Sequence, residues 1–382
     1  MASHETPENE WSRIEKAIRT SLRHIRDRYV GLNRHLTQDR TPFGGQSEQL
    51  EATPLQRLPV EVQLHIVALL SPRDLCRLGS TNCYWNAMVR DPLLWRYFLL
   101  RDLPHWNSVD HLSLPDATLL SKSLTDSAEH DYMAAYLKSS PEGRKHWKLS
   151  HPYSPVTSFL HFLVSRAEPR FAMFGPGLEQ LDSSLVRKMI SSPSLRLVAS
   201  LPQRQIDGIG SGISFLFNNE HKFNILTLYS TTWKERESAR MEESAAINKL
   251  FVQEGVADME PEGAQRQGPR YRIIPQVQNV CRAVDGFIYV ANAEARRKHK
   301  RQEELSQIQA MMDPALGSPS RPLLVLCCIS QPDVQRIPCV YVSHQLQLSL
   351  LDRPWLARDT DAESLVGFLE GIEWILRDVG RL

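Results

Sequence analysis

The 382-residue chain contains 42% hydrophobic and 23% charged residues, with a formal net charge of +1, a composition typical of folded soluble domains. It excludes a fibrous or wholly disordered protein, and the balance of 45 basic against 44 acidic residues excludes a general attraction to nucleic acid or membrane surfaces. No apolar stretch reaches the ~18 residues of a membrane-spanning helix, and the first residues, MASHETPENEW, are too polar for a signal peptide. We therefore expect two or three domains, no nucleic-acid or membrane partner, and a cytoplasmic protein, with the nucleus as an alternative location.

The six cysteines, at positions 76, 83, 281, 327, 328 and 339, include no C-x-x-C pair. Adjacent cysteines do not easily ligate one metal ion, and reduced cysteine is a common small core residue. Buried thiols are therefore favoured over zinc ligands or disulfides. The thirteen histidines contain no H-E-x-x-H pattern. We expect no metal and no cofactor.

A basic amphipathic segment comes first along the chain. Apolar residues recur at helical intervals through 11–36, among them Ile14, Ile18, Leu22 and Ile25, and predict one helix. Residues 37–53 are rich in Gly, Pro and polar side chains and predict a flexible linker.

A dense apolar helix follows in LPVEVQLHIVALLSPRDLCRLGSTN, residues 58–82. Its apolar residues cover most of the helical circumference rather than one stripe: Val60, Val62, Leu64, Ile66, Val67, Leu69 and Leu70. Such a helix must be buried on more than one side. Pro72 and Asp91-Pro92 mark the starts of further helices.

The order of residues across 55–100 resembles an F-box. The resemblance is carried by Leu58-Pro59, the aliphatic helix, Leu70-Ser71-Pro72, Asp74-Leu75, Leu78, Trp85 and Asp91-Pro92-Leu93-Leu94-Trp95. It implies a partner, the small Skp-type adaptor that joins F-box proteins to the cullin and RING subunits of ubiquitin ligases. This partner would cover the second apolar side of the helix, because a unit of about 40 residues rarely buries enough apolar surface alone.

Matching the family pattern position by position places adaptor contacts at Leu58, Pro59, Ile66, Leu69, Leu70, Pro72, Leu75, Leu78 and Trp95. The alternative for individual residues, Trp95 with Leu64 and Val89 above all, is that they only hold the three helices together.

Residues 101–165 read as a helical linker domain, and residues 166–382 change to strands alternating with helices. Strands are predicted at 171–174, 213–217, 223–230, 286–291, 322–328 and 339–343. Helices are predicted between or after them at 179–189, 234–251, 275–284, 293–312 and 361–376. The turn at 218–222 suits a hairpin, and the helical crossovers imply a mainly parallel sheet.

Six strands with one early hairpin resemble the Ras-like fold of small GTPases. The sequence thus predicts an α+β multidomain chain, in which an all-α F-box and helical linker precede a six-stranded α/β small-GTPase-like domain.

The nucleotide motifs of that fold are degraded. FGPGLEQLDSSL keeps Gly175 and Gly177 but lacks the phosphate-binding lysine, and LTLYSTTWKER lacks the magnesium-binding aspartate. Of the guanine-binding motif only Asp333 is kept, and 343–345 replace the Ser-Ala-Lys loop. A scaffold without nucleotide chemistry is favoured. The alternative is a GTP-binding signalling protein with an accessory helical domain.

An F-box joined to a nucleotide-free GTPase-like domain resembles one narrow branch of the F-box family. The resemblance implies a non-catalytic substrate receptor of a Skp–cullin–F-box E3 ubiquitin ligase that directs proteasomal degradation. It further implies substrates such as D-type cyclins and a telomeric repeat-binding factor, hence roles in the cell cycle and in telomere maintenance. It also implies homodimerisation through residues 1–54.

Substrate binding is expected at an edge of the sheet, where unpaired amides and carbonyls accept an extended segment. The sixth predicted strand lacks the charges that guard an edge, which suggests substrate contacts at Cys339, Val340, Tyr341, Val342 and Ser343, with the first, third and fifth side chains outward. The alternative is an edge covered by the last helix or by residues 346–351.

Two smaller patterns remain. The basic run 296–301 suits a nuclear import signal, but a solvated helical face is favoured. Thr6-Pro7 and Ser318-Pro319 resemble proline-directed phosphorylation sites.

Overall fold

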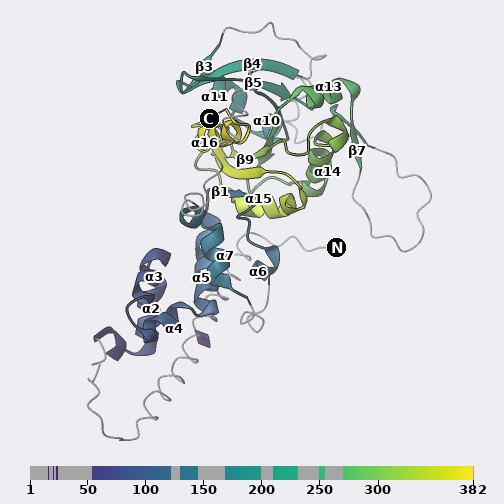
Figure 1. The fold of residues 1–382 in the computed structure, drawn as a ribbon. Coiled ribbons are helices and arrows are strands. Elements are labelled where there is room, and N and C mark those ends of the chain that lie inside the picture. The colour runs from purple at the N-terminus through teal and green to yellow at the C-terminus, as the bar shows by residue number, and fades with distance from the viewer. Residues whose placement is uncertain are drawn as a thin grey trace, which may run out of the picture. The chain divides into compact units, whose positions relative to one another are not determined.

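The computed structural model describes two compact units of the chain (Figure 1). The first lies within 1–104 and 115–147, and the second within 105–114 and 148–382. The structure describes residues 16, 20, 23–24, 54–121, 130–144, 168–198, 210–230, 249–253 and 270–381. Most of the predicted helix at 11–36, the linker at 37–53 and most of the predicted helix at 234–251 lie outside the described residues.

The described part of the first unit is helical (Figure 1). Its elements are the 3₁₀ turn η1 (Pro54–Arg57) and the helices α2 (Val60–Leu69), α3 (Pro72–Gly79), α4 (Cys83–Val89), α5 (Pro92–Asp102), α6 (Ala117–Ser121) and α7 (Tyr132–Ser139). Polar side chains cap several of these helices, among them α3, α4 and α5. The Ser71 side chain accepts the Asp74 N–H at 3.1 Å, the Asn82 side chain accepts the Trp85 N–H at 2.9 Å, and Asp91 caps α5.

The second unit contains a large, mostly parallel sheet covered by helices. Its strands are β1 (Ser108–Asp110), β2 (Arg170–Phe174), β3 (Leu195–Leu197), β4 (Gly210–Phe217), β5 (His221–Leu228), β8 (Gly286–Asn292), β9 (Leu323–Ile329) and β10 (Trp355–Asp361), in the order β1-β10-β9-β8-β2-β5-β4-β3. A separate pair joins β6 (Phe251–Gln253) to β7 (Tyr271–Ile273). The helices are α10 (Gly177–Gln180), α11 (Leu185–Ser191), α13 (Pro275–Ala283), α14 (Arg301–Met311), α15 (Cys339–Gln345) and α16 (Phe368–Asp378), with short turns η2 (Leu103–His105), η4 (Pro314–Leu316) and η5 (Leu348–Leu350).

Five of the six predicted strands are present, as β2, β4, β5, β8 and β9, and the sheet is mainly parallel as expected. Strands β5, β2, β8, β9 and β10 run parallel to their neighbours in that order, and β4 pairs antiparallel with β5. The predicted hairpin turn is present, with Asn218 and Asn219 at φ values of 51° and 60°. Asparagine tolerates this left-handed backbone better than most residues, which explains why two of them occupy the turn.

The predicted sixth strand at 339–343 is wrong, because these residues begin α15. The sixth strand is instead β10, which pairs in parallel with β9. A short apolar run does not distinguish a strand from a buried helix, and the sequence of β10, WLARDTD, is broken by charged residues. Those charges have internal partners. Asp359 accepts the Cys339 N–H at 2.9 Å, and Asp361 accepts the Glu363 N–H at 2.9 Å.

A strand from the first third of the chain extends the sheet beyond β10. Strand β1 pairs antiparallel with β10, with Val109 opposite Ala357, and all three of its residues are buried. Residues 105–114 therefore belong to the second unit, so that the predicted helical linker at 101–165 does not form one unit.

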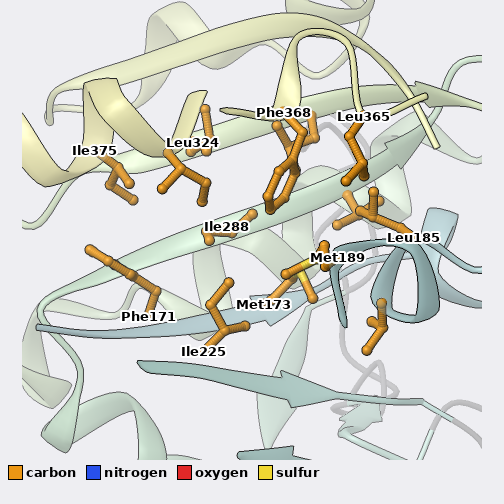
Figure 2. Packing of buried hydrophobic residues seen from close by; sticks show 14 of the residues in the cluster. Phe171, Met173, Leu185, Met189, Ile225, Ile288, Leu324, Leu365, Phe368 and Ile375 are labelled. Carbon is orange, nitrogen blue, oxygen red and sulfur yellow. The ribbon is translucent and has the colours of Figure 1, made fainter. Parts of the chain in front are cut away.

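Buried apolar side chains from strands and helices form a core on one face of the sheet (Figure 2). Phe171, Met173, Ile225, Ile288 and Leu324 come from the strands, and Phe368 and Ile375 come from α16. Helix α16 lies close to the sheet, since a Cβ at Gly371 would stand 3.1 Å from the Leu324 methyl groups. Among the described residues, no helix has the length and apolar character needed to cross a membrane.

Candidate functional site

The inner face of α2 holds the first unit together. Leu64, Val67 and Ala68 are buried, and the Arg101 guanidinium of α5 donates to the Ala68 carbonyl oxygen at 2.8 Å. Helices α3 and α4 approach closely at Gly79, where a Cβ would lie 3.2 Å from the Val89 side chain. One side of the dense apolar helix therefore forms an ordinary core.

The outer face of α2 exposes a second set of apolar side chains. Val62, Ile66 and Leu69 follow one another at helical spacing, and we call them the α2 stripe. Leu69 is 74% exposed and Val62 is 43% exposed, while Ile66 is half-buried. Helix α2 is therefore apolar on two faces. One face fills the core of the unit, and the other is open to solvent.

Residues next to the stripe extend the exposed apolar surface. Leu58 and Pro59 are exposed at the start of α2, while Leu70 and Pro72 are half-buried where α2 passes into α3. Leu78, on α3, is half-buried as well. Seven of the nine predicted adaptor contacts, including Ile66 and Leu69, thus reach the surface. Val62 was missed, although its spacing to Ile66 and Leu69 identifies it.

Two of the predicted contacts are buried in the unit itself. Leu75 and Trp95 have no exposed surface, and the Trp95 indole N–H donates to the Val89 carbonyl oxygen at 2.6 Å. A buried side chain cannot touch a partner in this conformation. The prediction that Leu75 and Trp95 contact the adaptor is therefore wrong for this conformation, in which both are core residues. For Trp95 this is the alternative that the sequence left open.

Polar side chains that the sequence analysis did not single out fasten the start of α2. The Gln63 amide donates to the Leu58 carbonyl oxygen at 2.8 Å and accepts from the Tyr84 hydroxyl. Burial raises the pKa of Tyr84. These bonds hold Leu58 and Pro59 in place beside α2. No local sequence pattern marks Gln63, because one of its partners, Tyr84, comes from another helix.

A second buried connection joins α5 to α7. The Tyr136 hydroxyl donates to the Asp102 carboxylate at 2.7 Å, and Arg101 forms an ion pair with Asp102 while lying 4.4 Å from the Phe98 ring centre. Burial and the neighbouring carboxylate raise the pKa of Tyr136 well above its usual value. The tyrosine therefore stays a neutral hydrogen-bond donor at physiological pH.

Polar groups follow Leu69 and Leu70 in the sequence, at the start of α3. The Ser71 hydroxyl donates to the Asp74 carboxylate at 2.8 Å, and Arg77 approaches the same carboxylate at 2.9 Å. These two hydrogen bonds, Ser71 first, lower the pKa of Asp74. The apolar surface thus has a charged border on its α3 side.

The carboxyl ends of the parallel strands are a second place where ligands commonly bind in sheets of this kind. Here the polar side chains bond to one another. Glu179 of α10 accepts the N–H and the hydroxyl of Ser230, after β5. Glu294, after β8, accepts the N–H of Ser330 at 3.0 Å and its hydroxyl at 2.5 Å. Among the described residues, these two glutamates and two serines are therefore already paired with one another.

The glycine loop after β2 is also occupied by protein. Gly175 has a φ of 124°, and a Cβ there would stand 2.6 Å from the Val290 carbonyl oxygen, while one on Gly177 would lie 2.8 Å from a Val290 methyl group. The loop therefore packs on β8. In the described part of the chain, no group of three or more His, Cys, Asp or Glu residues is arranged to hold a metal ion.

The predicted substrate-binding residues are not at a sheet edge. Cys339, Val340, Val342 and Ser343 are buried in α15, and Tyr341 is half-buried. The Cys339 thiol lies 3.3 Å from the Trp106 carbonyl oxygen, and the Ser343 hydroxyl donates to the Cys339 carbonyl oxygen at 2.7 Å. The backbone of these residues is engaged in the helix, so it cannot pair with an extended substrate segment.

Comparisons with known proteins find similarity to F-box proteins in the part of the first unit that carries the exposed apolar surface. A family model described as F-box-like matches residues 55–101. The chain is 55% identical over 379 residues to F-box only protein 4 of Homo sapiens, an alignment that covers 98% of this chain and 95% of that relative. F-box only protein 4 of Mus musculus is 54% identical over 378 residues, with 98% and 95% covered, and that of Bos taurus is 53% identical over 382 residues, with 99% and 96% covered. The chain therefore belongs to the family of F-box only protein 4.

Proposed function

We propose that this protein is the substrate-recognition subunit of a Skp–cullin–F-box ubiquitin ligase, and that it binds the Skp-type adaptor through the α2 stripe and its neighbours. The observation that carries the proposal is Leu69, which is 74% exposed on a helix whose opposite face is core. When a partner removes such an exposed apolar side chain from water, binding is stabilised by about 25 cal/mol for each Å² of apolar surface buried. The catalytic cysteines and the RING zinc ions then belong to other subunits.

A binding assay with the full chain tests the adaptor interface. Leu69→Arg places a charge in the apolar contact without touching the core, so the variant should fold normally and lose adaptor binding. Val366→Arg is the matched control, because Val366 is 67% exposed in the other unit. Equal adaptor binding by both variants would place the interface elsewhere.

The second unit is proposed to be a small-GTPase-like scaffold that binds the substrate. Its order β4-β5-β2-β8-β9-β10, with β4 antiparallel to the rest, corresponds to that of the Ras-like fold, to which β1 and β3 add one strand at each edge. The internal pairs Glu179 with Ser230 and Glu294 with Ser330 support a scaffold without nucleotide.

Because residues 339–343 form a helix and not an edge strand, the edge proposed for substrate docking is strand β3. Among the described residues no strand pairs with the outer side of β3, and its Arg196 and Leu197 are exposed. An extended segment could add a strand there by backbone pairing. D-type cyclins and telomeric repeat-binding factors remain the proposed substrate types, and Leu197→Pro should weaken their binding while adaptor binding is kept.

The competing function is a GTP-binding signalling protein. Binding of GTP with Mg²⁺ to the native state would raise the melting temperature, since a ligand at 100 times its Kd stabilises by about 2.7 kcal/mol. We expect no shift in the melting temperature at millimolar nucleotide. A reproducible shift that is specific for guanine nucleotides would favour the signalling function instead.

We also propose that the protein forms a homodimer and that it is located in the cytoplasm, with the nucleus as the alternative. The dimerisation region proposed here, 1–54, lies almost wholly outside the described residues. Light scattering of the full chain across a range of concentrations measures the mass directly, and a mass of one chain at every concentration would contradict a dimer. Fractionation of cells into cytoplasm and nucleus tests the proposed location.

A further inference from the structure

Ser71 stands in an extended segment between two helices, beside the exposed leucines. Leu70 and Ser71 have φ and ψ values of −70° and 155°, and −69° and 150°. Pro72 follows directly, and both Ser71 and Arg73 are exposed. A kinase binds its substrate serine in an extended strand, and Leu70 and Ser71 already have that backbone shape.

The serine-proline pairs of the described residues differ in accessibility. Ser140 is buried and Ser192 is half-buried, whereas Ser71 and Ser318 are exposed. Of the two exposed serines, Ser71 lies between Leu69 and Pro72, within the proposed adaptor interface. Ser318 lies in the other unit and offers a natural internal control.

We propose that Ser71 is a phosphorylation site for a proline-directed kinase and that the phosphate prevents adaptor binding. The inference rests on the proposed function, since it assigns a regulatory switch to the same surface. In the reaction the Ser71 hydroxyl oxygen attacks the γ-phosphorus of ATP. The new oxygen–phosphorus bond forms as the bond to the bridging oxygen breaks, ADP leaves, and the hydroxyl proton passes to the kinase's base.

The phosphate changes the interface through charge. A phosphoserine carries about −1.5 to −2 charges at pH 7, and it would stand among Leu69, Leu70 and Pro72, where binding removes water. It would also remove the hydrogen bond that the Ser71 hydroxyl now donates to Asp74 at 2.8 Å. Docking the adaptor over this dianion would remove water from it, which is unfavourable, so affinity falls.

The fold of α3 tolerates the same charge. Ser71 caps α3, and its oxygen accepts the Asp74 N–H at 3.1 Å. A negative group at the first turn of a helix is favourable, and the exposed Arg73 and Arg77 of the same helix oppose the repulsion between the phosphate and the Asp74 carboxylate. The modification therefore acts on binding rather than on folding.

The experiment treats the full chain with a proline-directed kinase and ATP, maps the phosphates by mass spectrometry, and measures adaptor affinity. Wild type should gain phosphate at Ser71 and lose affinity by roughly tenfold or more. Ser71→Asn keeps a helix-capping side chain but accepts no phosphate, so its affinity should survive the treatment. Ser318→Ala should respond to the kinase as wild type does.

The outcomes separate this inference from the function on which it rests. If the untreated protein does not bind the adaptor, the proposed function fails and the switch fails with it. If the untreated protein binds, two results overturn the switch alone: no phosphate at Ser71 of the folded chain, or unchanged affinity after phosphorylation. Circular dichroism of the phosphorylated chain should match that of the untreated chain, and a loss of helix would mean that the phosphate acts by unfolding.

Discussion

Leu69 and Leu75 lie on either side of the turn between α2 and α3, yet they have opposite environments. Leu69 is 74% exposed and Leu75 is fully buried. Leu75→Ala should lower the free energy of unfolding by about 2–5 kcal/mol and leave the adaptor affinity of the folded protein unchanged. Denaturant titration and an adaptor-binding isotherm measure the two effects.

The reciprocal change is Leu69→Ala. It should weaken adaptor binding by about 1–2 kcal/mol, more than most interface residues contribute, and alter stability by less than about 0.5 kcal/mol. If Leu69→Ala destabilises the protein as much as Leu75→Ala does, the separation into a core leucine and an interface leucine is wrong.

Trp95 serves the unit through its hydrogen bond as well as its volume. Trp95→Phe would leave the Val89 carbonyl oxygen without the indole N–H that now lies 2.6 Å away. We expect a loss of about 1–3 kcal/mol in the free energy of unfolding. Trp374→Phe, at a half-buried tryptophan of α16, is the control and should cost less. Similar costs for the two variants would count against the hydrogen bond.

The family pattern identified the region of the candidate interface, because apolar residues around the whole of α2 require a partner on the second side. It did not separate Leu75 and Trp95 from the exposed residues. Residue type sets hydrophobicity, whereas the side of the core on which a leucine falls depends on how the helices pack. Helical spacing alone would have added Val62 to the set, since it continues the line of Ile66 and Leu69.

Elements α15 and β10 show where local sequence patterns fail for the fold. CVYVS has the apolar, β-branched composition of a strand but forms a helix, while WLARDTD contains three charged residues but forms a strand paired on both sides, with β1 and with β9. The charges of β10 are accommodated by tertiary contacts, such as the Arg336 guanidinium 3.3 Å from the Asp359 carboxylate. Those contacts involve residues distant in sequence, so no local pattern predicts them.

The Asp359 carboxyl group of β10 makes the stability of the fold depend on pH. Burial, partly opposed by Arg336, raises the pKa of this carboxyl above its ordinary value of 3.8. A raised native pKa means that the folded state holds the proton more tightly than the unfolded state does. Its contribution to stability is therefore present below the unfolded pKa and is lost as the pH rises through the native pKa.

Comparison of wild type with Asp359→Asn isolates this contribution. The difference in the free energy of unfolding, wild type minus variant, should decrease as the pH is raised from about 3 towards neutrality. Other titrating groups cancel because they are common to both proteins. A difference that increases over the same range would mean that the ion pair with Arg336 outweighs burial.

The two units have separate proposed roles, adaptor binding in the first and substrate binding in the second. The exposed leucines lie in the first unit, whereas the sheet with its β3 edge lies in the second. The sheet could be largely predicted from its apolar strands. Strand β1 could not, since SVD is too short to show a strand pattern and depends on β10 for its pairing.

A division of this kind predicts a variant that separates substrate binding from ligase recruitment. Leu69→Arg alters only an exposed side chain of the first unit, so the second unit should keep its affinity for substrate. Overproduced in cells, this variant should bind substrate without delivering it to the ligase, and should therefore lengthen the substrate's half-life, whereas overproduced wild type should shorten it. Cycloheximide-chase measurements of a D-type cyclin would show the difference. Equal shortening by both proteins would mean that the exposed leucine of α2 does not connect the receptor to the ligase.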